Sequence, residues 1–414
     1  MNEEVFRLKK CRVCRHEVLS EVISFGMSPL ANAFLKSDEI DSREYFYPLT
    51  LVFCENCKFL QLGHVVSPNL LFDDYVYVSS TSPVFIKHFE SFGQKLISRF
   101  DLNKNSLVVD IGSNDGILLR PLKNMGIGVM GVEPARHIAK LATDSGIPTT
   151  ADWFTVSTAR KIRQEKGHAD VITGTNVFAH IHDLDEVLKG VRYLLKDDGV
   201  FITESPYLVD FIKKSYFDLV YHEHLSYWSV RSLKFLFSRF DMEIFYVEKV
   251  SVHGGSIRVY AKKRSGKHKL DKSVNSFLTK EKALSLGEKK TYKKYELKIL
   301  DNKRKVIDLL TKLKKQNKII VGYGAPAKGN TLLNYFKIGN EILDYIVDDS
   351  KFKQGLYTPG THIPVVSSEM LKTKKPDYVF ILAWNFSESI ISNLSWLRKK
   401  KVKFIIPVPS PSVK

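Results

Sequence analysis

The sequence of 414 residues has only four cysteines, no apolar run of membrane-spanning length and no arginine-rich block. A helix needs about 20 consecutive apolar residues to cross a bilayer, so we expect no association with a membrane. The first residues lack the basic and apolar character of a signal peptide, and we expect a soluble, cytoplasmic protein. The length exceeds what a single hydrophobic core accommodates and fits two or three domains.

Acidic residues are relatively few. The chain has 45 aspartates and glutamates and 63 lysines and arginines, which gives a net charge of +18. An excess of this size is compatible with nucleic-acid binding. Much of it, however, is lysine scattered over amphipathic stretches between 262 and 318 and near the C-terminus, without interleaved aromatic residues. We interpret it as a solvated lysine surface and expect no nucleic-acid partner. A basic cleft between domains that attracts a diphosphate is compatible with the same charge.

The cysteines form two pairs, Cys11-x-x-Cys14 and Cys54-x-x-Cys57. Two such knuckles can place four thiolates tetrahedrally around one zinc ion. Disulfides are the alternative, but the cytoplasm disfavours them. We therefore predict a structural zinc site whose four positions are all sulfur, without an open position for catalysis. The surrounding module, residues 1–80, would be marginally stable without its metal.

Short apolar segments in the middle of the chain alternate with helical or turn sequence. We expect strands at 107–111, 128–133, 169–173 and 199–204, and a helix at 83–100 in front of them. This alternation predicts a mostly parallel sheet with helices on both faces. The fold class is therefore α/β.

A second α/β unit of Rossmann type is predicted near the C-terminus. Its strands are expected at 318–324, 342–347, 378–383 and 403–407. The clearest helix of the chain, from 280 to 315, precedes this unit. One face of this helix carries an apolar stripe and the other carries lysines; the stripe consists of Tyr292, Tyr295, Ile299, Val306, Leu310 and Leu313. Packing against its own domains is the default expectation, and pairing with another chain is the alternative.

A glycine-rich turn follows the first strand of the middle unit. The strand ends at Asp110, the turn is Gly112-Ser-Asn114-Asp-Gly116, and a helical pattern follows. Strand, turn and helix N-terminus in this order form a cradle for a nucleotide cofactor, because glycine permits a close approach. The next strand ends in Glu133, where a carboxylate can accept hydrogen bonds from both hydroxyls of a ribose. The alternative is an ordinary turn of an α/β domain. The spacing differs from G-x-G-x-x-G and resembles the S-adenosylmethionine site of class I methyltransferases.

The tightest polar constellation is Tyr221-His222-Glu223-His224, which follows the strand at 199–204. A histidine that a carboxylate holds in one tautomer is a general base near neutral pH. A neighbouring tyrosine can donate to a developing enolate oxygen. A metal fragment is disfavoured because the H-E-x-x-H spacing is absent. A core histidine satisfied by the backbone is the alternative for either imidazole alone, and we favour a catalytic role for the cluster.

Two more segments end strands of the middle unit. Asn176 and His180 follow the fourth strand and place another imidazole at the expected reaction centre. Asp152 and Trp153 follow the third strand and suit an adenine, by a hydrogen bond and by stacking. Packing explains the aromatic residue nearly as well.

Further candidates lie outside these strand ends. Tyr75 and Tyr77 belong to a segment that is rich in hydroxyl groups for a mere linker. His253 precedes two glycines in a strand-edge turn that is placed to approach a ligand. Tyr323 stands between two glycines of the C-terminal unit, and Lys328 follows at a helix N-terminus, where a cation and the helix dipole would act together on a phosphate. A purely structural turn is an equally good interpretation.

Taken in order, these motifs resemble one family over nearly the whole chain, the sugar C-methyltransferases that act on nucleotide-linked keto-deoxysugars. The matching segments are Cys11/Cys14/Cys54/Cys57, Tyr75–Ser80, Asp110–Gly116, Asn176–Ile181, Glu204–Leu208, Tyr221–His224, His253–Gly255 and Gly322–Lys328. The order and composition of the set are specific, although no single motif would be. The resemblance implies a zinc module at 1–80, a class I methyltransferase domain at 81–262, a helical extension at 263–317 and a smaller Rossmann-like domain at 318–414.

The resemblance also implies a mechanism. His224, paired with Glu223, would take a proton from the ring carbon beside a ketone. Tyr221, with Tyr75 or Tyr77, would stabilise the enolate, which attacks the methyl group of S-adenosylmethionine. The cofactor would be held by Asp110, Gly112, Asn114, Gly116, Glu133, Asp152, Trp153 and Asn176. The sugar nucleotide, which would lie between the middle and C-terminal domains, would contact His180, Tyr207, His253, Tyr323 and Lys328.

Several properties stay open at this point. C3 is the favoured carbon over C5, the nucleotide can be dTDP, GDP or CDP, and we expect a monomer. Transfer to oxygen or nitrogen of a similar acceptor is the nearest alternative. A nicotinamide oxidoreductase is disfavoured because a third glycine after Gly324 and a Tyr-x-x-x-Lys pair are absent. A zinc-module nucleic-acid binder would leave the Tyr-His-Glu-His segment without a use.

Overall fold

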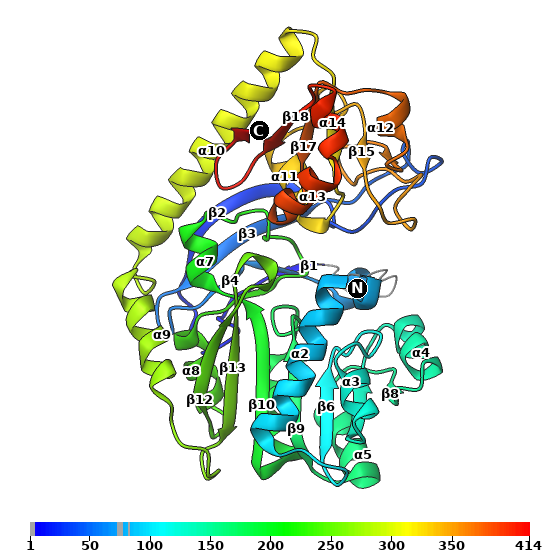
Figure 1. Ribbon diagram of the computed structural model, residues 1–414. Helices are drawn as coiled ribbons and strands as arrows, with labels where there is room; N and C mark the ends of the chain where they lie inside the picture. Colours follow the sequence, from blue (N-terminus) through cyan, green and yellow to red (C-terminus); the bar gives the residue numbers. More distant parts are fainter. Residues whose placement is uncertain (1–4, 73–77, 82) are drawn as a thin grey trace.

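Four sheets organise the protein, for which the computed structural model describes residues 5–72, 78–81 and 83–414 apart from the side chains of residues 72, 81, 83 and 253. Two α/β domains lie at opposite ends of the molecule, and strands of the N-terminal module lie between them (Figure 1). The predicted fold class, a zinc module followed by two α/β domains, is confirmed. No helix within the described ranges is both long and apolar enough to span a bilayer.

The middle domain contains a seven-stranded sheet with the order β12-β13-β10-β9-β6-β7-β8. Strands β10, β9, β6, β7 and β8 are mutually parallel, and β13 is antiparallel to both of its neighbours. The strands are β6 (Leu107–Ile111), β7 (Gly128–Val132), β8 (Thr149–Thr150), β9 (Ala169–Thr175), β10 (Leu195–Pro206), β12 (Met242–Val250) and β13 (Ser256–Lys263). The chain first builds β7 on one side of β6 and then β9 on the other. Ligands of such sheets bind at this reversal, at the carboxyl ends of β6 and β9.

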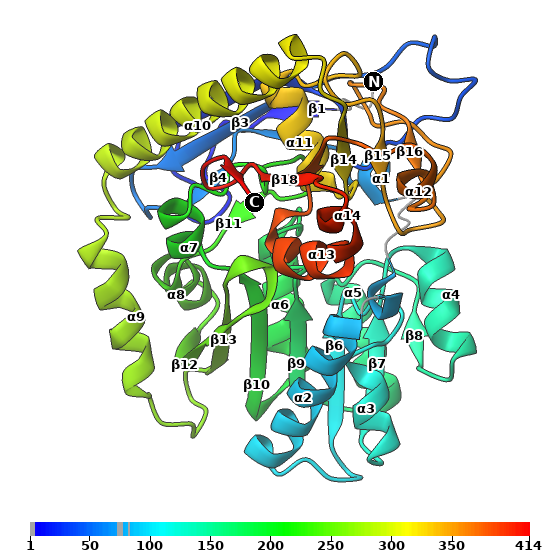
Figure 2. The same ribbon diagram turned by 45° about the horizontal axis from the view of Figure 1, so that its top comes forward.

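Helices cover both faces of this sheet (Figure 2). The helices in this part of the chain are η1 (Ser79–Thr81), α2 (Pro83–Phe100), α3 (Leu119–Asn124), α4 (Arg136–Asp144), α5 (Val156–Lys166), α6 (Leu184–Leu194), α7 (Leu208–Lys213), α8 (Val230–Ser238) and η2 (Val252–Gly254). Val108 packs with the apolar face of α2, whereas Val109 belongs to the cluster that contains residues of α5 and α6. Successive strand residues point to opposite faces, which explains why all of β6 is buried and apolar up to Asp110.

The N-terminal module contains a two-stranded sheet and most of a four-stranded antiparallel sheet with the order β11-β4-β3-β2. Its elements are β1 (Val5–Arg7), β2 (Leu19–Ser28), β3 (Tyr47–Cys54), β4 (Leu60–Leu62), β5 (His64–Val66) and α1 (Pro68–Phe72). The edge strand β11 (Ser226–Tyr227) comes from the middle of the chain, with Ser226 opposite Gln61. The module is therefore joined to the segment that follows His224 by a shared sheet.

The C-terminal domain contains a six-stranded sheet with the order β16-β15-β14-β17-β18-β19, parallel except at β19. Its strands are β14 (Ile320–Tyr323), β15 (Ile346–Val347), β16 (Val365–Val366), β17 (Tyr378–Ile381), β18 (Lys403–Ile406) and β19 (Ser412–Val413). Its helices are α11 (Ala327–Phe336), α12 (Met370–Thr373), η3 (Trp384–Phe386), α13 (Ser387–Asn393) and α14 (Ser395–Lys399). The strand order reverses at β14 and β17, as it does in the middle domain.

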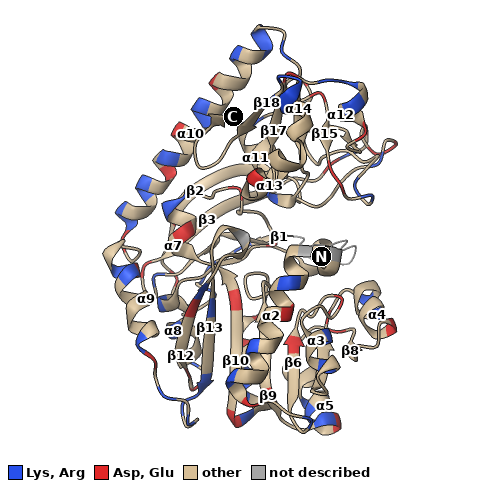
Figure 3. Ribbon diagram, in the orientation of Figure 1, with Lys and Arg blue, Asp and Glu red and all other residues tan. Residues whose placement is uncertain are grey.

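The prediction of one helix from 280 to 315 was wrong, because the structure has two helices here, α9 (Lys272–Ala283) and α10 (Lys289–Lys315). Ser285 adopts a left-handed backbone with φ of 52°, which ends α9. The break lets α9 pack on β12 while α10 contacts β2 and runs along the C-terminal domain (Figure 1). The apolar stripe of α10 is buried. Basic residues line its outer side, with acidic residues among them (Figure 3).

Candidate active site

The turn after β6 is built around two glycines with left-handed backbone. Gly112 has φ of 65° and Gly116 has φ of 78°. A Cβ on Gly112 would lie 2.6 Å from Cγ2 of Val177, in the segment that follows β9. The turn therefore passes so close to its neighbour that only glycine fits without a shift. Asn114 continues the turn with φ of 50°, and its Oδ1 accepts a hydrogen bond from the backbone N–H of Ser79 at 2.8 Å.

Two buried carboxylates flank this turn. Asp110 is 2% exposed and accepts a hydrogen bond of 2.6 Å from the hydroxyl of Thr173. Burial raises the pKa of Asp110 to about 7. Glu133 accepts hydrogen bonds of 3.0 Å from the backbone N–H groups of Asn114 and Ala135, one on each carboxylate oxygen, and burial raises its pKa. Each oxygen keeps a further lone pair for a ligand hydroxyl.

The residues at this edge of the sheet fit S-adenosylmethionine. Gly112 lets the turn lie directly against Val177, and Glu133 presents acceptors at the end of the neighbouring strand. Asn176, at the carboxyl end of β9, has φ of 57°, and its buried Oδ1 has no hydrogen-bond partner among the described residues. Asp152 and Trp153 follow β8 and are exposed, with 43% of Trp153 accessible.

The two predicted histidines meet beyond the ends of β9 and β10. Their rings, in His180 and His224, lie 4.8 Å apart between centroids in an edge-to-face arrangement. Nδ1 of His224 lies 2.8 Å from the carbonyl oxygen of Leu219. A carbonyl only accepts, so Nδ1 carries the proton and Nε2 is the basic atom. The hydroxyl of Tyr221 donates to Nε2 at 2.8 Å, and all three rings are partly exposed.

The expected pairing of His224 with Glu223 was wrong. Adjacent side chains leave the backbone in different directions, and the Glu223 carboxylate instead accepts a hydrogen bond of 2.6 Å from the amide of Asn32 in the N-terminal module. Burial raises the pKa of Glu223 to about 7. The tautomer of His224 is held by the backbone of Leu219, which no sequence pattern indicates.

The other predicted positions differ in their surroundings. Tyr75 and Tyr77 lie outside the described residues, as does the side chain of His253, whose backbone belongs to η2. Tyr207 is buried, and its hydroxyl donates to Glu281 of α9 at 3.0 Å. This contact joins two helical segments and gives Tyr207 a structural role.

In the C-terminal domain, the donors of the glycine turn bind aspartate side chains of the same domain. The N–H of Ala325 donates to the Asp348 carboxylate at 2.6 Å, and the Tyr323 hydroxyl donates to Asp349 at 3.1 Å. Lys328 donates to the amide oxygen of Asn385, and its Nζ lies 3.8 Å from the ring centroid of Trp384. The groups expected to bind a phosphate thus have partners within this domain. Burial lowers the pKa of Lys328 to about 8.

The four cysteine sulfurs lie within 4.8 Å of one another. The Sγ atoms of Cys11 and Cys57 are 3.6 Å apart, and those of Cys14 and Cys54 are 3.4 Å apart. Zn–S bonds of about 2.3 Å in a tetrahedron separate the sulfurs by about 3.8 Å. The cluster therefore fits one zinc ion held by sulfur alone.

Sequence reasoning missed the partners of two buried carboxylates, Asp218 and Glu204. Asp218 is fully buried, and its carboxylate accepts a hydrogen bond from the indole N–H of Trp384, so the C-terminal domain holds the residue before Leu219. Glu204 of β10 is paired with Arg258 of β13, whose Nη2 lies 2.6 Å from it, and with His88 of α2 at 2.9 Å. The partners are 54 or more positions apart in the sequence, so local spacing could not have found them.

Comparison with known proteins decides the family. Three family models match successive parts of the chain: a zinc binding domain over residues 11–72, a methyltransferase domain over 85–247 and a C-methyltransferase C-terminal domain over 251–409. The chain is 36% identical over 413 residues to C-methyltransferase NovU of Streptomyces niveus, across 100% of this chain and 98% of that protein. The chain belongs to the C-methyltransferase family. This C-methyltransferase uses S-adenosylmethionine and carries a zinc-binding module.

Shorter likenesses connect parts of the C-methyltransferase with other methyltransferases. It is 27% identical over 118 residues to a ubiquinone biosynthesis O-methyltransferase of Bartonella bacilliformis, across 26% of this chain and 46% of that protein. The crystal structure of an S-adenosylmethionine-dependent methyltransferase from Clostridium acetobutylicum aligns with a TM-score of 0.35 and 15% identity, across 43% of this chain and 91% of that one. The match to NovU spans the whole chain, so the family assignment rests on it.

Proposed function

We propose that this C-methyltransferase transfers a methyl group to the ring carbon beside the ketone of a nucleotide-linked 4-keto-deoxysugar, with C3 as the favoured carbon. The observation that carries the proposal is the basic Nε2 of His224 with the Tyr221 hydroxyl at 2.8 Å. A carbon acceptor must first lose a proton, and a carbon beside a ketone is acidic enough for an imidazole base. The family assignment favours carbon over oxygen or nitrogen.

In this proposal His224 is the general base. Its Nδ1–H stays on the Leu219 carbonyl, which keeps the lone pair on Nε2 and stabilises the imidazolium that forms. Nε2 takes the proton from the substrate carbon, and the C–H electron pair moves into the enolate. The Tyr221 hydroxyl, released from Nε2, donates to the enolate oxygen. Tyr75 and Tyr77 are proposed as further donors to that oxygen, and His180 as a residue that orients the sugar.

The cofactor is proposed to lie over the turn after β6. When bound, S-adenosylmethionine supplies the electrophilic methyl group that the enolate carbon takes up as the C–S bond breaks. Glu133 would accept from the ribose hydroxyls, and Asp152 and Trp153 would contact the adenine. The remaining proposed contacts are Asp110, Gly112, Asn114, Gly116 and Asn176.

The C-terminal domain is proposed to bind the nucleotide part of the substrate. It faces the histidine segment, because Trp384 contacts Asp218. Tyr323, Lys328 and His253 are the proposed contacts for a dTDP, GDP or CDP group. Binding of a phosphate by Lys328 would require it to exchange its contact with Asn385. We propose a small-molecule acceptor and no nucleic acid.

Proton exchange separates these steps. The enzyme is incubated in deuterated water with dTDP-4-keto-6-deoxyglucose, first with S-adenosylhomocysteine and then with S-adenosylmethionine, and the sugar is analysed by mass spectrometry. We expect deuterium beside the ketone in the first case and one added methyl group in the second. The same sugar reduced to its 4-hydroxyl form is the control and should gain neither. Methylation of this reduced sugar would refute the enolate mechanism and favour transfer to oxygen.

The base is tested by His224→Asn. This variant should lose about 10²-fold or more of both exchange and methylation, because a general base contributes 10²- to 10⁴-fold. Its affinity for S-adenosylmethionine, measured by calorimetry, should stay within about twofold, because the imidazole lies beyond the proposed cofactor contacts. Wild-type exchange in this variant would remove His224 as the base.

A further inference from the structure

The zinc module reaches the two histidine segments directly. Leu62 of β4 donates its backbone N–H to the carbonyl of Leu225 at 3.1 Å, and Ser226 pairs with Gln61 in the shared sheet. The two residues that follow His224 are thus held by the edge of the module's sheet. This fixes one of the two imidazoles relative to the module, but it does not fix the segment that carries His180.

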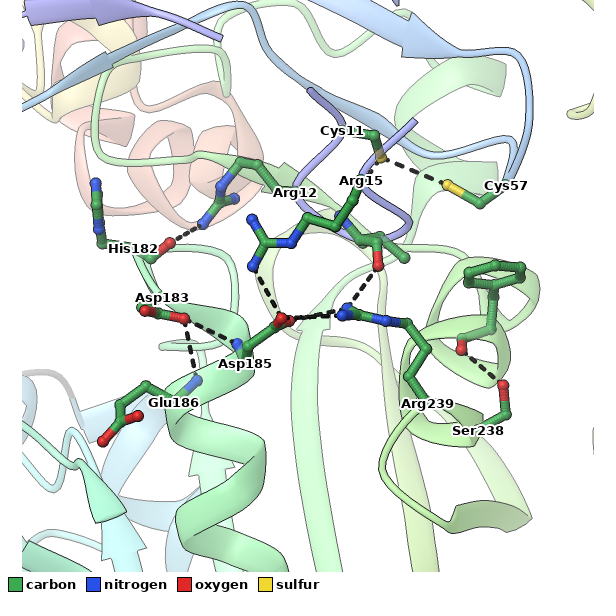
Figure 4. Close-up of polar contacts among 12 residues, drawn as sticks. Cys11, Arg12, Arg15, Cys57, His182, Asp183, Asp185, Glu186, Ser238 and Arg239 are labelled. Atoms are coloured by element: carbon green, nitrogen blue, oxygen red, sulfur yellow. Dashed lines mark hydrogen bonds and ion pairs between the residues drawn. The ribbon is translucent and has the colours of Figure 1, made fainter. Parts of the chain in front are cut away.

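Arg12, between the two cysteines of the first knuckle, joins both segments. Arg12 is buried, with 6% of the residue exposed. Its Nη1 donates to the Ser226 hydroxyl at 2.5 Å, and its Nη2 donates to the carbonyl of His182 at 2.9 Å and to that of Ile181. Figure 4 shows this side chain pointing from the knuckle toward His182. One planar group therefore contacts residues 181 and 182, next to His180, and residue 226, two positions after His224.

We propose that Arg12 is a positioning residue that sets the distance between His180 and His224, so that the zinc knuckle serves catalysis as well as the folding of its module. The inference rests on the proposed function, in which His224 is the base and His180 orients the sugar. Arg12 touches neither the substrate nor the cofactor in this proposal. It acts through the two backbone segments that carry the imidazoles.

Packing around His224 is incomplete on one side. A cavity of about 20 Å³ there is lined in part by Ala179, Leu219, His224 and Ser226. A gap leaves its lining side chains without contacts on that side, so directional hydrogen bonds contribute more to the position of this segment. The guanidinium fork supplies directional donors to fixed carbonyls on one side and to a hydroxyl on the other, which a lysine cannot reproduce.

The knuckle holds Arg12 rigidly at its other end. The backbone N–H of Arg12 donates to the side-chain oxygen of Gln61 at 3.1 Å. The carbonyl oxygen of the preceding residue, Cys11, accepts a hydrogen bond from the backbone N–H of Arg15 at 2.9 Å. Four sulfur ligands on one ion would fix the residues on both sides of Arg12. The backbone of Arg12 is therefore held both by the knuckle and by β4, the strand that pairs with Ser226. A guanidinium on such a rigid backbone can hold the segments that carry His180 and His224 at a defined separation.

Arg15 provides a matched control on the same knuckle. It follows Cys14, its side chain is 53% exposed, and it pairs with Asp185 at 2.9 Å, a carboxylate that Arg239 also contacts (Figure 4). Its removal takes one positive charge from the knuckle, as removal of Arg12 does, but leaves the donors to residues 181, 182 and 226 in place. A general effect of charge or of knuckle stability would alter both variants.

The experiment compares Arg12→Gln, Arg12→Lys and Arg15→Gln with the wild type. The variants are labelled with ¹⁵N-histidine, and the ring signals of His180 and His224, assigned from His180→Gln and His224→Asn, are recorded without any acceptor. Zinc content, affinity for S-adenosylmethionine, kcat and KM for the keto sugar are measured on the same samples. Because the ring signals need no acceptor, failure of the proposed substrate would leave this test of Arg12 intact.

We expect Arg12→Gln to retain one zinc ion and wild-type cofactor affinity, to shift both ring signals and to lose 10- to 100-fold in kcat with a smaller change in KM. Arg12→Lys should lie between it and the wild type, and Arg15→Gln should change kcat less than threefold. Unshifted ring signals in Arg12→Gln, or equal losses in Arg15→Gln, would overturn the proposal. If Arg12→Gln loses its zinc, Ser226→Ala decides instead, because it removes one acceptor of Arg12 outside the knuckle. Shifted ring signals with full zinc would then support the proposal, and unchanged ones would overturn it.

Discussion

Replacement of Gly112 by alanine tests the turn proposed to hold the cofactor. The residue has φ of 65°, a left-handed conformation that costs an L-residue about 1–2 kcal/mol. The new Cβ would also lie 2.6 Å from Cγ2 of Val177, and overpacking of this kind costs about 1–3 kcal/mol. We therefore expect Gly112→Ala to destabilise the fold by about 2–5 kcal/mol. Because the turn must move to relieve the contact, affinity for S-adenosylmethionine should fall at least tenfold.

Two further variants separate the cost of the left-handed backbone from the cost of the contact with Val177. Gly126 has φ of 80°, and a Cβ there would have no heavy atom within 4 Å, so Gly126→Ala carries the backbone cost alone and should leave cofactor binding unchanged. Val177→Ala in the Gly112→Ala background removes Cγ2, the atom at 2.6 Å, and leaves Cβ at 3.0 Å. The double variant should therefore be more stable than the sum of the single effects by about 1–3 kcal/mol. Urea unfolding followed by circular dichroism, and calorimetric titration with S-adenosylmethionine, measure these values. Additive effects, or wild-type affinity in Gly112→Ala, would refute the argument.

Three further predictions concern the metal, pH and a buried ion pair. Cys54→Ser should bind less than a tenth of the wild-type zinc by mass spectrometry and melt at lower temperature; full zinc content would contradict the assignment. Burial raises the pKa of Asp110 to about 7, so the folded state holds a proton that the unfolded state loses near pH 4, and stability falls as pH rises from 5 to 7. Asp110→Asn should make the midpoint of urea unfolding less dependent on pH over that range. If the pH dependence of the midpoint is unchanged, Asp110 does not contribute to it. Glu204→Ala removes one of the two carboxylate partners of the buried Arg258, which keeps Glu248 at 3.1 Å, and should cost about 3 kcal/mol, the lower end of the range for a broken buried pair. Lys140→Ala, in an exposed pair with Asp144, should cost less than about 0.5 kcal/mol. Equal losses of stability in the two variants would contradict this prediction.

Local sequence patterns were sufficient for the fold class and for both cofactors. Alternating strands and helices require a parallel sheet, so the middle and C-terminal domains were predictable from segments of 5–10 residues. The spacing Cys-x-x-Cys, twice, predicts a sulfur site because two residues between ligands bring both thiolates to one side of a turn. The strand end at Asp110 and the glycine at 112 indicate a cofactor turn because backbone conformation depends on adjacent residues.

The hydrogen-bond partners of Glu223 and His224 depended on the tertiary structure instead. Glu223 is adjacent to His224 in sequence, yet its carboxylate pairs with Asn32, 191 positions away, while the imidazole is held by the backbone of Leu219. The break between α9 and α10 likewise depended on tertiary contacts, because α9 packs on β12 whereas α10 contacts β2.

The sequence by itself therefore determined which elements form and which residue types stand at their ends. Only the tertiary structure decided that the zinc module shares a sheet with the segment after His224, and that Arg12 contacts residues 181, 182 and 226. The physical reason is that a hydrogen bond depends on the position of two atoms and not on the number of residues between them. Contacts between segments more than 150 residues apart follow from how the domains pack, which no local spacing records.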